Sequence, residues 1–201
     1  KVMNKMFEII RSTKDWMYAI KHYKDAVVLK GNVKLDHYRD NECIYSHWMD
    51  KPNIFTTEGM AYLNNVMFFN TAKPSLVTVS IWSVGIFKVN VVPALGDTAA
   101  AKLGSGGTYG ECQDADYDTP ATNKPEYITA TTATAVITNA VSPASFTIAS
   151  SITVYGAFLG LTRAKATASG TLMCAKAFDT ARVVVDNDVL AVTYQITCAS
   201  S

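Results

Sequence analysis

The chain has little charge and no apolar run long enough to cross a bilayer, which takes about 20 residues. Only 17% of its 201 residues are Asp, Glu, Lys or Arg, and the formal net charge is +1. This balance gives no electrostatic basis for binding nucleic acid or an anionic membrane surface. We therefore expect neither nucleic acid nor a membrane among the partners. The polar surface must consist largely of Thr, Ser and Asn, which suits burial against other subunits.

Cysteine is also scarce, and its spacing excludes the common metal and redox motifs. None of the four cysteines forms a Cys-x-x-Cys pair, and no histidine stands at zinc-ligand spacing from any of them. Cys174 and Cys198 lie among apolar residues, where a thiol behaves as a small hydrophobic side chain. We expect buried, reduced thiols, synthesis in the cytoplasm, and neither a cofactor nor a metal.

From residue 76 onward the chain is a succession of short strand-like runs. They are rich in Val, Ile, Thr, Tyr and Phe and are separated by Gly, Pro, Asn, Asp and Ser, a pattern typical of β-strands. Regular strands with short turns predict a mainly β protein, an antiparallel β-sandwich of the jelly-roll or immunoglobulin-like type. We assign the body of the sandwich to residues 51–201. The expected strands are 76–88, 127–134, 135–141, 145–149, 152–159, 170–178 and 189–198.

One short helix is predicted near residues 57–69, where it would cap the sandwich. Thr56 or Thr57 can cap its start by accepting a hydrogen bond from an unpaired backbone N–H. Glu58 then lies in the first turn, where the helix dipole favours a negative charge. Apolar residues recur at helical spacing along one face. They are Met60, Leu63, Val66 and Met67.

Residues 1–50 are predicted to form an N-terminal arm, helical at first and then extended, that makes attachment or oligomer contacts. An apolar stripe at helical spacing opens the chain, and Trp16 follows it. We expect the stripe and this Trp to dock on a partner, although the stripe equally suits packing within the same subunit. Residues 27–38 suggest a hairpin with its turn at Gly31-Asn32, and a longer helix through Val28 is the alternative. The stripe consists of Met3, Met6, Phe7 and Ile10.

Residues 93–125 form the longest stretch without strand character. A loop of this length in a compact domain is usually functional or mobile. It is therefore the predicted exposed contact loop. Its expected contact residues are Tyr109, Asp114, Asp116 and Tyr117.

No pattern in the chain makes a convincing catalytic or metal site. Asp114, Asp116 and Asp118 alternate like the first ligands of a calcium loop, but Thr119 and Pro125 occupy the positions that need Gly and Glu. With Glu111 and Glu126 they form an acidic cluster that could supply the two facing carboxylates of a glycan hydrolase. The three histidines have no adjacent nucleophile motif, so we expect surface or packing roles for them. The residues by themselves indicate a structural or binding domain and not an enzyme.

Eight segments between about residue 38 and the C-terminus carry a family resemblance through their order along the chain. They are residues 53–63, 82–87, 97–100, 126–127, 152–159, 169–172, 178 and 188–194. In this order the chain resembles a family of small virion structural proteins of tailed bacteriophages. The resemblance implies a component of the virion, made in the host cytoplasm and present in many copies on the particle. It implies no catalytic residues.

The resemblance leaves the position on the particle open between head, neck and tail. Our first hypothesis is a capsid-bound decoration or head-fibre protein that forms a homo-oligomer, expected to be a trimer, around a symmetry axis. The second is a neck- or tail-associated protein that binds host-surface glycans through exposed aromatic residues such as Tyr109 and Tyr117. The third is a glycan hydrolase built on Glu111 and Asp116. In the first two cases the partners are phage capsid, neck or tail proteins.

Overall fold

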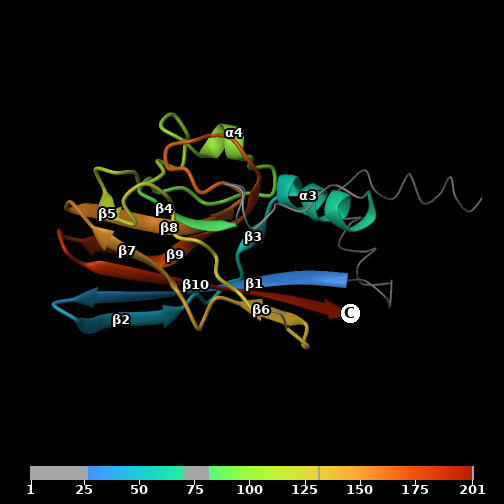
Figure 1. The fold of residues 1–201 in the computed structure, drawn as a ribbon, viewed down its shortest axis with the longest axis horizontal. Helices are drawn as coiled ribbons and strands as arrows, with labels where there is room; N and C mark the ends of the chain where they lie inside the picture. The colour runs from blue at the N-terminus through green and yellow to red at the C-terminus, as the bar shows by residue number, and fades with distance from the viewer. Residues whose placement is uncertain (1–26, 70–81, 131, 201) are drawn as a thin grey trace, which may run out of the picture.

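The computed structural model describes residues 27–69, 82–130 and 132–200, which form two antiparallel sheets packed face to face (Figure 1). The six-stranded sheet has the order β2 (Glu42–Trp48), β1 (Val27–Arg39), β10 (Val189–Ser200), β7 (Ala144–Ile148) and β5 (Tyr117–Thr119), and β6 (Val136–Thr138) also pairs with β10. The four-stranded sheet has the order β3 (Ile54–Phe55), β9 (Leu172–Val184), β8 (Ile152–Gly160) and β4 (Ser83–Phe87). The predicted antiparallel β-sandwich is confirmed.

The main core lies between the two sheets and is built from alternate residues of the facing strands. Val33 and Leu35 of β1 are buried, and they pair with Tyr194 and Val192 of β10. Because successive side chains of a strand point to opposite faces, these residues share the inner face. Burying a large apolar side chain contributes about 1.5–3 kcal/mol, so this layer is the main source of stability. The smaller sheet adds Val84, Ile86, Val154 and Leu159 to the same core.

The smaller sheet is also covered on its outer face, by the connection between β4 and β5. A second buried cluster joins Phe87 and Phe158 of the sheet to Leu103 and Tyr109 of this connection. The short helix α4 (Ala99–Lys102) of the connection lies over the sheet (Figure 1). Every residue of β4 is buried, as expected for a strand covered on both faces. The stretch 93–125, predicted as an exposed loop, is therefore mostly a packed layer of the fold.

The predicted helix is confirmed as α3 (Thr57–Phe68), with Thr56 as its N-cap. The Thr56 hydroxyl accepts a hydrogen bond from the Gly59 N–H at 3.0 Å. Glu58 lies in the first turn and accepts hydrogen bonds from the N–H groups of Leu172 at 2.7 Å and Ala99 at 2.9 Å. Its carboxylate therefore fastens the helix both to the start of β9 and to the start of α4.

β1 runs without interruption from Val27 to Arg39, so the turn predicted at Gly31-Asn32 is wrong. The alternative of a helix through Val28 is also wrong. The strand pairs residue by residue with β10, and this long ladder outweighs the local turn tendency of a Gly-Asn pair. Gly31 is needed for close packing instead, because a Cβ there would lie 2.0 Å from the side chain of Asn53. The hairpin turn lies at residues 40–41, between β1 and β2.

Part of the predicted N-terminal arm is integral to the sandwich. Residues 27–48 supply β1 and β2 of the larger sheet, next to β10. Residues 1–26 lie outside the described residues. The predicted docking residues Met3, Met6, Phe7, Ile10 and Trp16 fall in this segment.

Two further expectations are corrected. No strand forms over residues 127–130 or 132–134, where one was predicted. Tyr127 instead ties this segment to its surroundings, because its N–H donates to the Trp82 carbonyl at 2.8 Å and its hydroxyl to the Tyr194 carbonyl at 3.3 Å. All four cysteines are unpaired thiols, and Cys174 is buried as expected, but Cys198 is exposed near the end of β10.

The turn between β9 and β10 is held by the buried Asp188. The carboxylate accepts hydrogen bonds from Arg39 Nη2 at 2.7 Å and from the Val185 N–H at 2.9 Å, and His37 Nε2 lies 2.9 Å away. The hydrogen bonds from Arg39 hold the pKa of Asp188 well below its usual value, against the opposing effect of burial. The group ties the turn to the end of β1.

Gly59→Ala is expected to destabilise the protein, although alanine is normally the better helix residue by about 1 kcal/mol. A Cβ at this position would lie 2.5 Å from the carbonyl oxygen of Met173 in β9. Strand backbone cannot move aside as a flexible side chain would, so we expect a loss of about 1–3 kcal/mol in the free energy of unfolding. Urea denaturation measures this loss. Asn64→Ala, at an exposed position of α3, is the control and should be neutral or slightly stabilising. A variant Gly59→Ala as stable as the wild type would contradict the close contact.

Asp188→Asn is expected to reduce the free energy of unfolding at neutral pH by about 1–3 kcal/mol. It should also make the free energy of unfolding less dependent on pH in the acidic range. The folded-state pKa of Asp188 lies below its unfolded value of about 3.9. The ionised carboxylate therefore stabilises the fold above that value, and this contribution is lost as the pH falls through the folded-state pKa. Denaturation midpoints measured down to about pH 2 should fall more steeply for the wild type than for the variant. Asp186→Asn, exposed in the same turn, should keep the wild-type profile; parallel profiles for wild type and Asp188→Asn would refute the assignment.

Candidate functional site

Glu111, Asp114 and Asp116, in the connection between β4 and β5, are each paired with a lysine. Glu111 and Lys124 form the most buried of these pairs, with 2.9 Å between Oε1 and Nζ and side chains no more than 1% exposed. The second oxygen of Glu111 accepts a hydrogen bond from the Gly104 N–H at 2.8 Å, and Lys124 Nζ donates to the Ala164 carbonyl at 2.6 Å. Burial lowers the pKa of Lys124, and the Glu111 charge opposes this effect. The pair thus joins the connection between β4 and β5 to the segments around Lys124 and Ala164.

Asp114 and Asp116 also face lysines and not a common centre. Both oxygens of Asp116 accept hydrogen bonds from Lys88 Nζ at 2.7 Å, and one accepts a further bond from the Gln113 N–H at 2.8 Å. Asp114 lies 2.9 Å from Lys165 Nζ. A calcium loop requires its oxygens to converge on one ion, and a glycan hydrolase requires two carboxylates facing a cleft. The arrangement gives no support to either reading of the acidic cluster.

The prediction that Tyr109 and Tyr117 are exposed contact residues is wrong. Both are buried: the Tyr109 ring packs against Phe87 with 4.8 Å between centroids, and the Tyr117 ring meets Phe146 edge to face. The Tyr109 hydroxyl donates to Asp97 at 2.7 Å, and burial raises the pKa of both tyrosines. Asp116, the third predicted contact residue, is buried as well, and Asp114 alone is exposed. The Tyr109 ring fills the layer over the smaller sheet, and the Tyr117 ring belongs to the main core between the two sheets.

The far end of α3 carries a run of exposed apolar side chains. Met67, Phe68 and Phe69 are 70%, 80% and 79% exposed. Of the predicted apolar face of the helix, Met60 and Leu63 pack against the main core. Figure 1 shows this end of α3 at the same end of the molecule as the start of β1 and the C-terminal end of β10. Contiguous exposed apolar residues mark protein contact sites more often than free surface. We call Met67, Phe68 and Phe69 the α3 apolar end.

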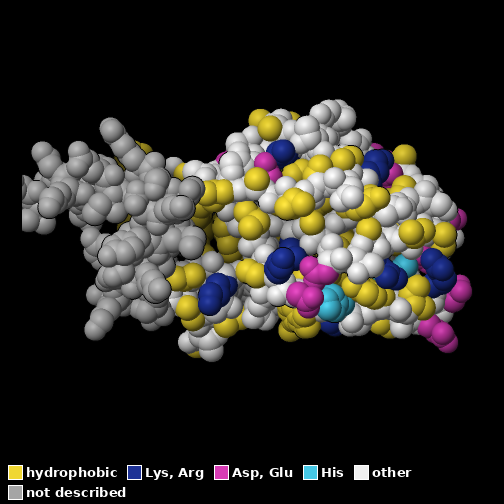
Figure 2. Space-filling model, turned by 180° about the vertical axis from the view of Figure 1, so that it is seen from behind, with side chains coloured by type: hydrophobic (Ala, Val, Ile, Leu, Met, Phe, Trp, Pro, Cys, Tyr) yellow, Lys and Arg dark blue, Asp and Glu magenta, His cyan; other side chains and the backbone are white. Residues whose placement is uncertain are grey.

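Elsewhere the surface is poor in charge, as the composition predicts. Figure 2 shows one face on which hydrophobic and uncharged side chains predominate and charged side chains form small groups. Among the described residues, no helix has both the length and the apolar character needed to cross a membrane.

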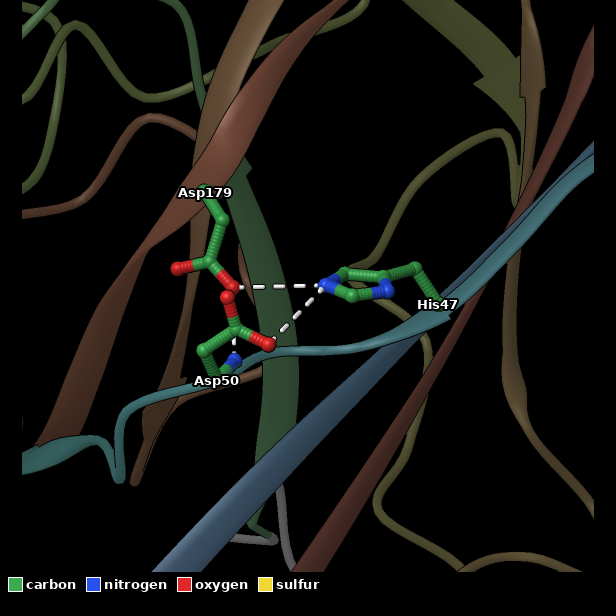
Figure 3. Close-up of side chains that lie close together, drawn as sticks. All are labelled: His47, Asp50 and Asp179. Carbon is green, nitrogen blue, oxygen red and sulfur yellow. Dashed lines mark hydrogen bonds and ion pairs between the residues drawn. The ribbon is translucent and has the colours of Figure 1, made fainter.

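His47, Asp50 and Asp179 form one group of side chains that could hold a metal ion. His47 lies on β2 and Asp179 on β9, and Figure 3 shows the imidazole pointing at both carboxylates. No sequence motif indicates this group, because 129 positions separate Asp50 from Asp179. The only local signal was a histidine with an acid three positions later, which by itself is too common to indicate a site.

Comparison of the chain with family models, with curated proteins and with solved structures finds no match. The fold and the contacts described above are therefore the observations on which a function can be argued.

Lys124→Met is expected to cost about 3–5 kcal/mol, because the buried Glu111 carboxylate would lose its counter-charge. The double variant Glu111→Gln/Lys124→Met leaves a neutral amide whose oxygen can still accept from the Gly104 N–H, so part of the loss should be recovered. Urea unfolding of both single variants and the double variant gives the coupling free energy. Lys51→Met, at an exposed position, is the control and should change stability by less than about 0.5 kcal/mol. Strictly additive losses would mean that the two side chains do not stabilise each other.

Proposed function

We propose that this chain is a structural protein of a tailed-phage virion, bound in many copies to the outside of the head as a decoration or head-fibre subunit. The observation that carries the proposal is the α3 apolar end, because the side chains of Met67, Phe68 and Phe69 are exposed to solvent although they are large and apolar. The order of the sequence segments that resemble phage virion proteins supports the same reading. The proposed role is binding and not catalysis.

The α3 apolar end is well placed to make the contact with the shell. Burying a large apolar side chain is worth about 1.5–3 kcal/mol, so three such side chains can supply most of a stable contact. Val27, which begins β1 at the same end of the molecule, is 79% exposed (Figure 1). Val27 directly follows residues 1–26 in the chain, the segment that contains the sequence-predicted docking stripe. Both features therefore point to one end as the attachment end.

We further propose that the subunits associate with one another in a closed ring, with a trimer as the expected form. β2 is an edge strand of the larger sheet, paired with β1 on one side, and Ile44 and Trp48 on it are 47% and 41% exposed. Exposed edge strands with apolar side chains tend to pair with other chains unless they are covered. Cyclic association covers such edges in every copy at once.

The experiment that tests the function is a symmetry-aware cryo-electron microscopy reconstruction of purified particles carrying this protein. Many copies at icosahedral positions on the shell, contacting it through the α3 apolar end, are expected. About a dozen copies at the unique vertex would overturn the head assignment and favour the neck or tail alternative. Absence of the chain from purified particles would reject a virion role altogether.

Phe68→Asp/Phe69→Asp is expected to abolish attachment while leaving the fold intact, because both side chains are exposed in the free protein. Loss of two buried phenyl rings should weaken binding by about 100-fold or more. Co-sedimentation of the purified protein with particles that lack it measures the affinity, and circular dichroism checks the fold. Val141→Asp introduces a charge at another exposed apolar position, outside the proposed contacts, and should leave attachment unchanged. Attachment of the double variant at wild-type affinity would refute the role of the α3 apolar end.

A further inference from the structure

Three side chains from the two sheets meet where an edge of one sheet faces the other (Figure 3). His47 belongs to β2, Asp179 belongs to β9, and Asp50 lies in the connection between β2 and β3. His47 Nε2 lies 3.4 Å from Asp179 Oδ2 and 3.7 Å from Asp50 Oδ1. From this geometry we propose that His47, Asp50 and Asp179 bind a divalent transition-metal ion of the zinc type, which clamps the two sheets together.

The distances suit a small ion with short bonds. A tetrahedral ion bonded at about 2.0–2.1 Å holds its ligand atoms roughly 3.4 Å apart. The two separations from His47 Nε2, 3.4 and 3.7 Å, are close to this value, and all three ligand atoms lie within 4.8 Å of one another. Small rotations of the Asp50 side chain, which is 79% exposed, bring the third ligand to the ion. Three protein ligands leave one position open to water.

The type of ligand decides which ions fit. An imidazole nitrogen beside two carboxylates is a set that zinc and its neighbours in the transition series accept. Magnesium and calcium prefer oxygen ligands throughout, and they need more of them than this site supplies. We therefore expect selectivity for zinc over magnesium and calcium.

Contacts outside the ligand set hold Asp179 in position. Lys176 Nζ donates to its Oδ1 at 3.0 Å, and the Asp50 N–H donates to its Oδ2 at 2.6 Å. Partial burial acts to raise the pKa of Asp179, but the Asp50 N–H and Lys176 outweigh it and lower the pKa overall. The ligand is thus ionised and oriented by neighbours, as in established metal sites.

The balance of charge around the site favours a cation. Two carboxylates face a single ammonium group, that of Lys176, at this site. Direct contact of His47 with the two carboxylates, without a metal, is the alternative state. Metal titration distinguishes the two states, because only the metal site binds zinc in one-to-one stoichiometry and loses it when a ligand is removed.

The test is isothermal titration calorimetry of the full chain with Zn²⁺. We expect one ion per chain, no binding of Mg²⁺ at the same concentration, and a rise in Tm of about 5 °C or more at a zinc concentration 100 times Kd. His47→Gln and Asp179→Asn should each weaken zinc binding by about tenfold or more. Substitution of Co²⁺ for Zn²⁺ should give an absorption spectrum of four-coordinate nitrogen and oxygen ligation without a thiolate band.

Two control variants separate this site from adventitious binding. Asp40→Asn removes an exposed negative charge in the β1–β2 turn and should leave zinc affinity unchanged. Cys43→Ser/Cys198→Ser removes the exposed thiols, which bind zinc readily, and should also leave it unchanged. Zinc binding that is lost in the cysteine variant, or that survives both ligand variants, would overturn the proposal. So would an affinity weaker than about 1 mM in the wild type.

Discussion

The ladder between β1 and β10 is the contact on which the rest of the structure depends. It runs from Val27 opposite Ser200 to Tyr38 opposite Val189, and so joins the first described strand to the last. Because side chains alternate along a strand, a slip of one residue would turn the inner residues of both strands outward. β2 pairs with the other side of β1 and forms the edge of the sheet. At this edge, His47 Nε2 lies 3.4 Å from Asp179 Oδ2 in the other sheet.

A second constraint is the burial of the smaller sheet on both faces. One face packs on the larger sheet, and the other needs the connection between β4 and β5 as its cover. That connection has few regular elements of its own, so side-chain contacts must hold it in place. The buried pair of Glu111 and Lys124 does so at four points, and the Tyr109 ring fills the space beneath. The charged side chains of Glu111 and Lys124 therefore hold the connection in place on the sheet.

The surface features that remain are of two kinds, and they suggest two separate properties. The α3 apolar end stands exposed although its helix is well capped and anchored by Glu58. A hydrophobic contact with another protein is the simplest physical use for it. The group of His47, Asp50 and Asp179 is polar and partly exposed, and it bridges the two sheets. None of its three residues belongs to the α3 apolar end. Attachment and metal binding can thus be tested independently.

Local pattern was sufficient to predict the sandwich, most of its strands and the helix α3. Alternation, capping and turn chemistry act over a few residues, and such signals can be read directly from the chain. Tertiary structure decided the features that depend on distant partners. It made residues 27–39 one strand through a Gly-Asn pair, buried Tyr109 and Tyr117, and paired Glu111 and Asp116 with lysines. It also brought Asp179 to His47, because only the packing of one sheet on the other can join residues so far apart in sequence.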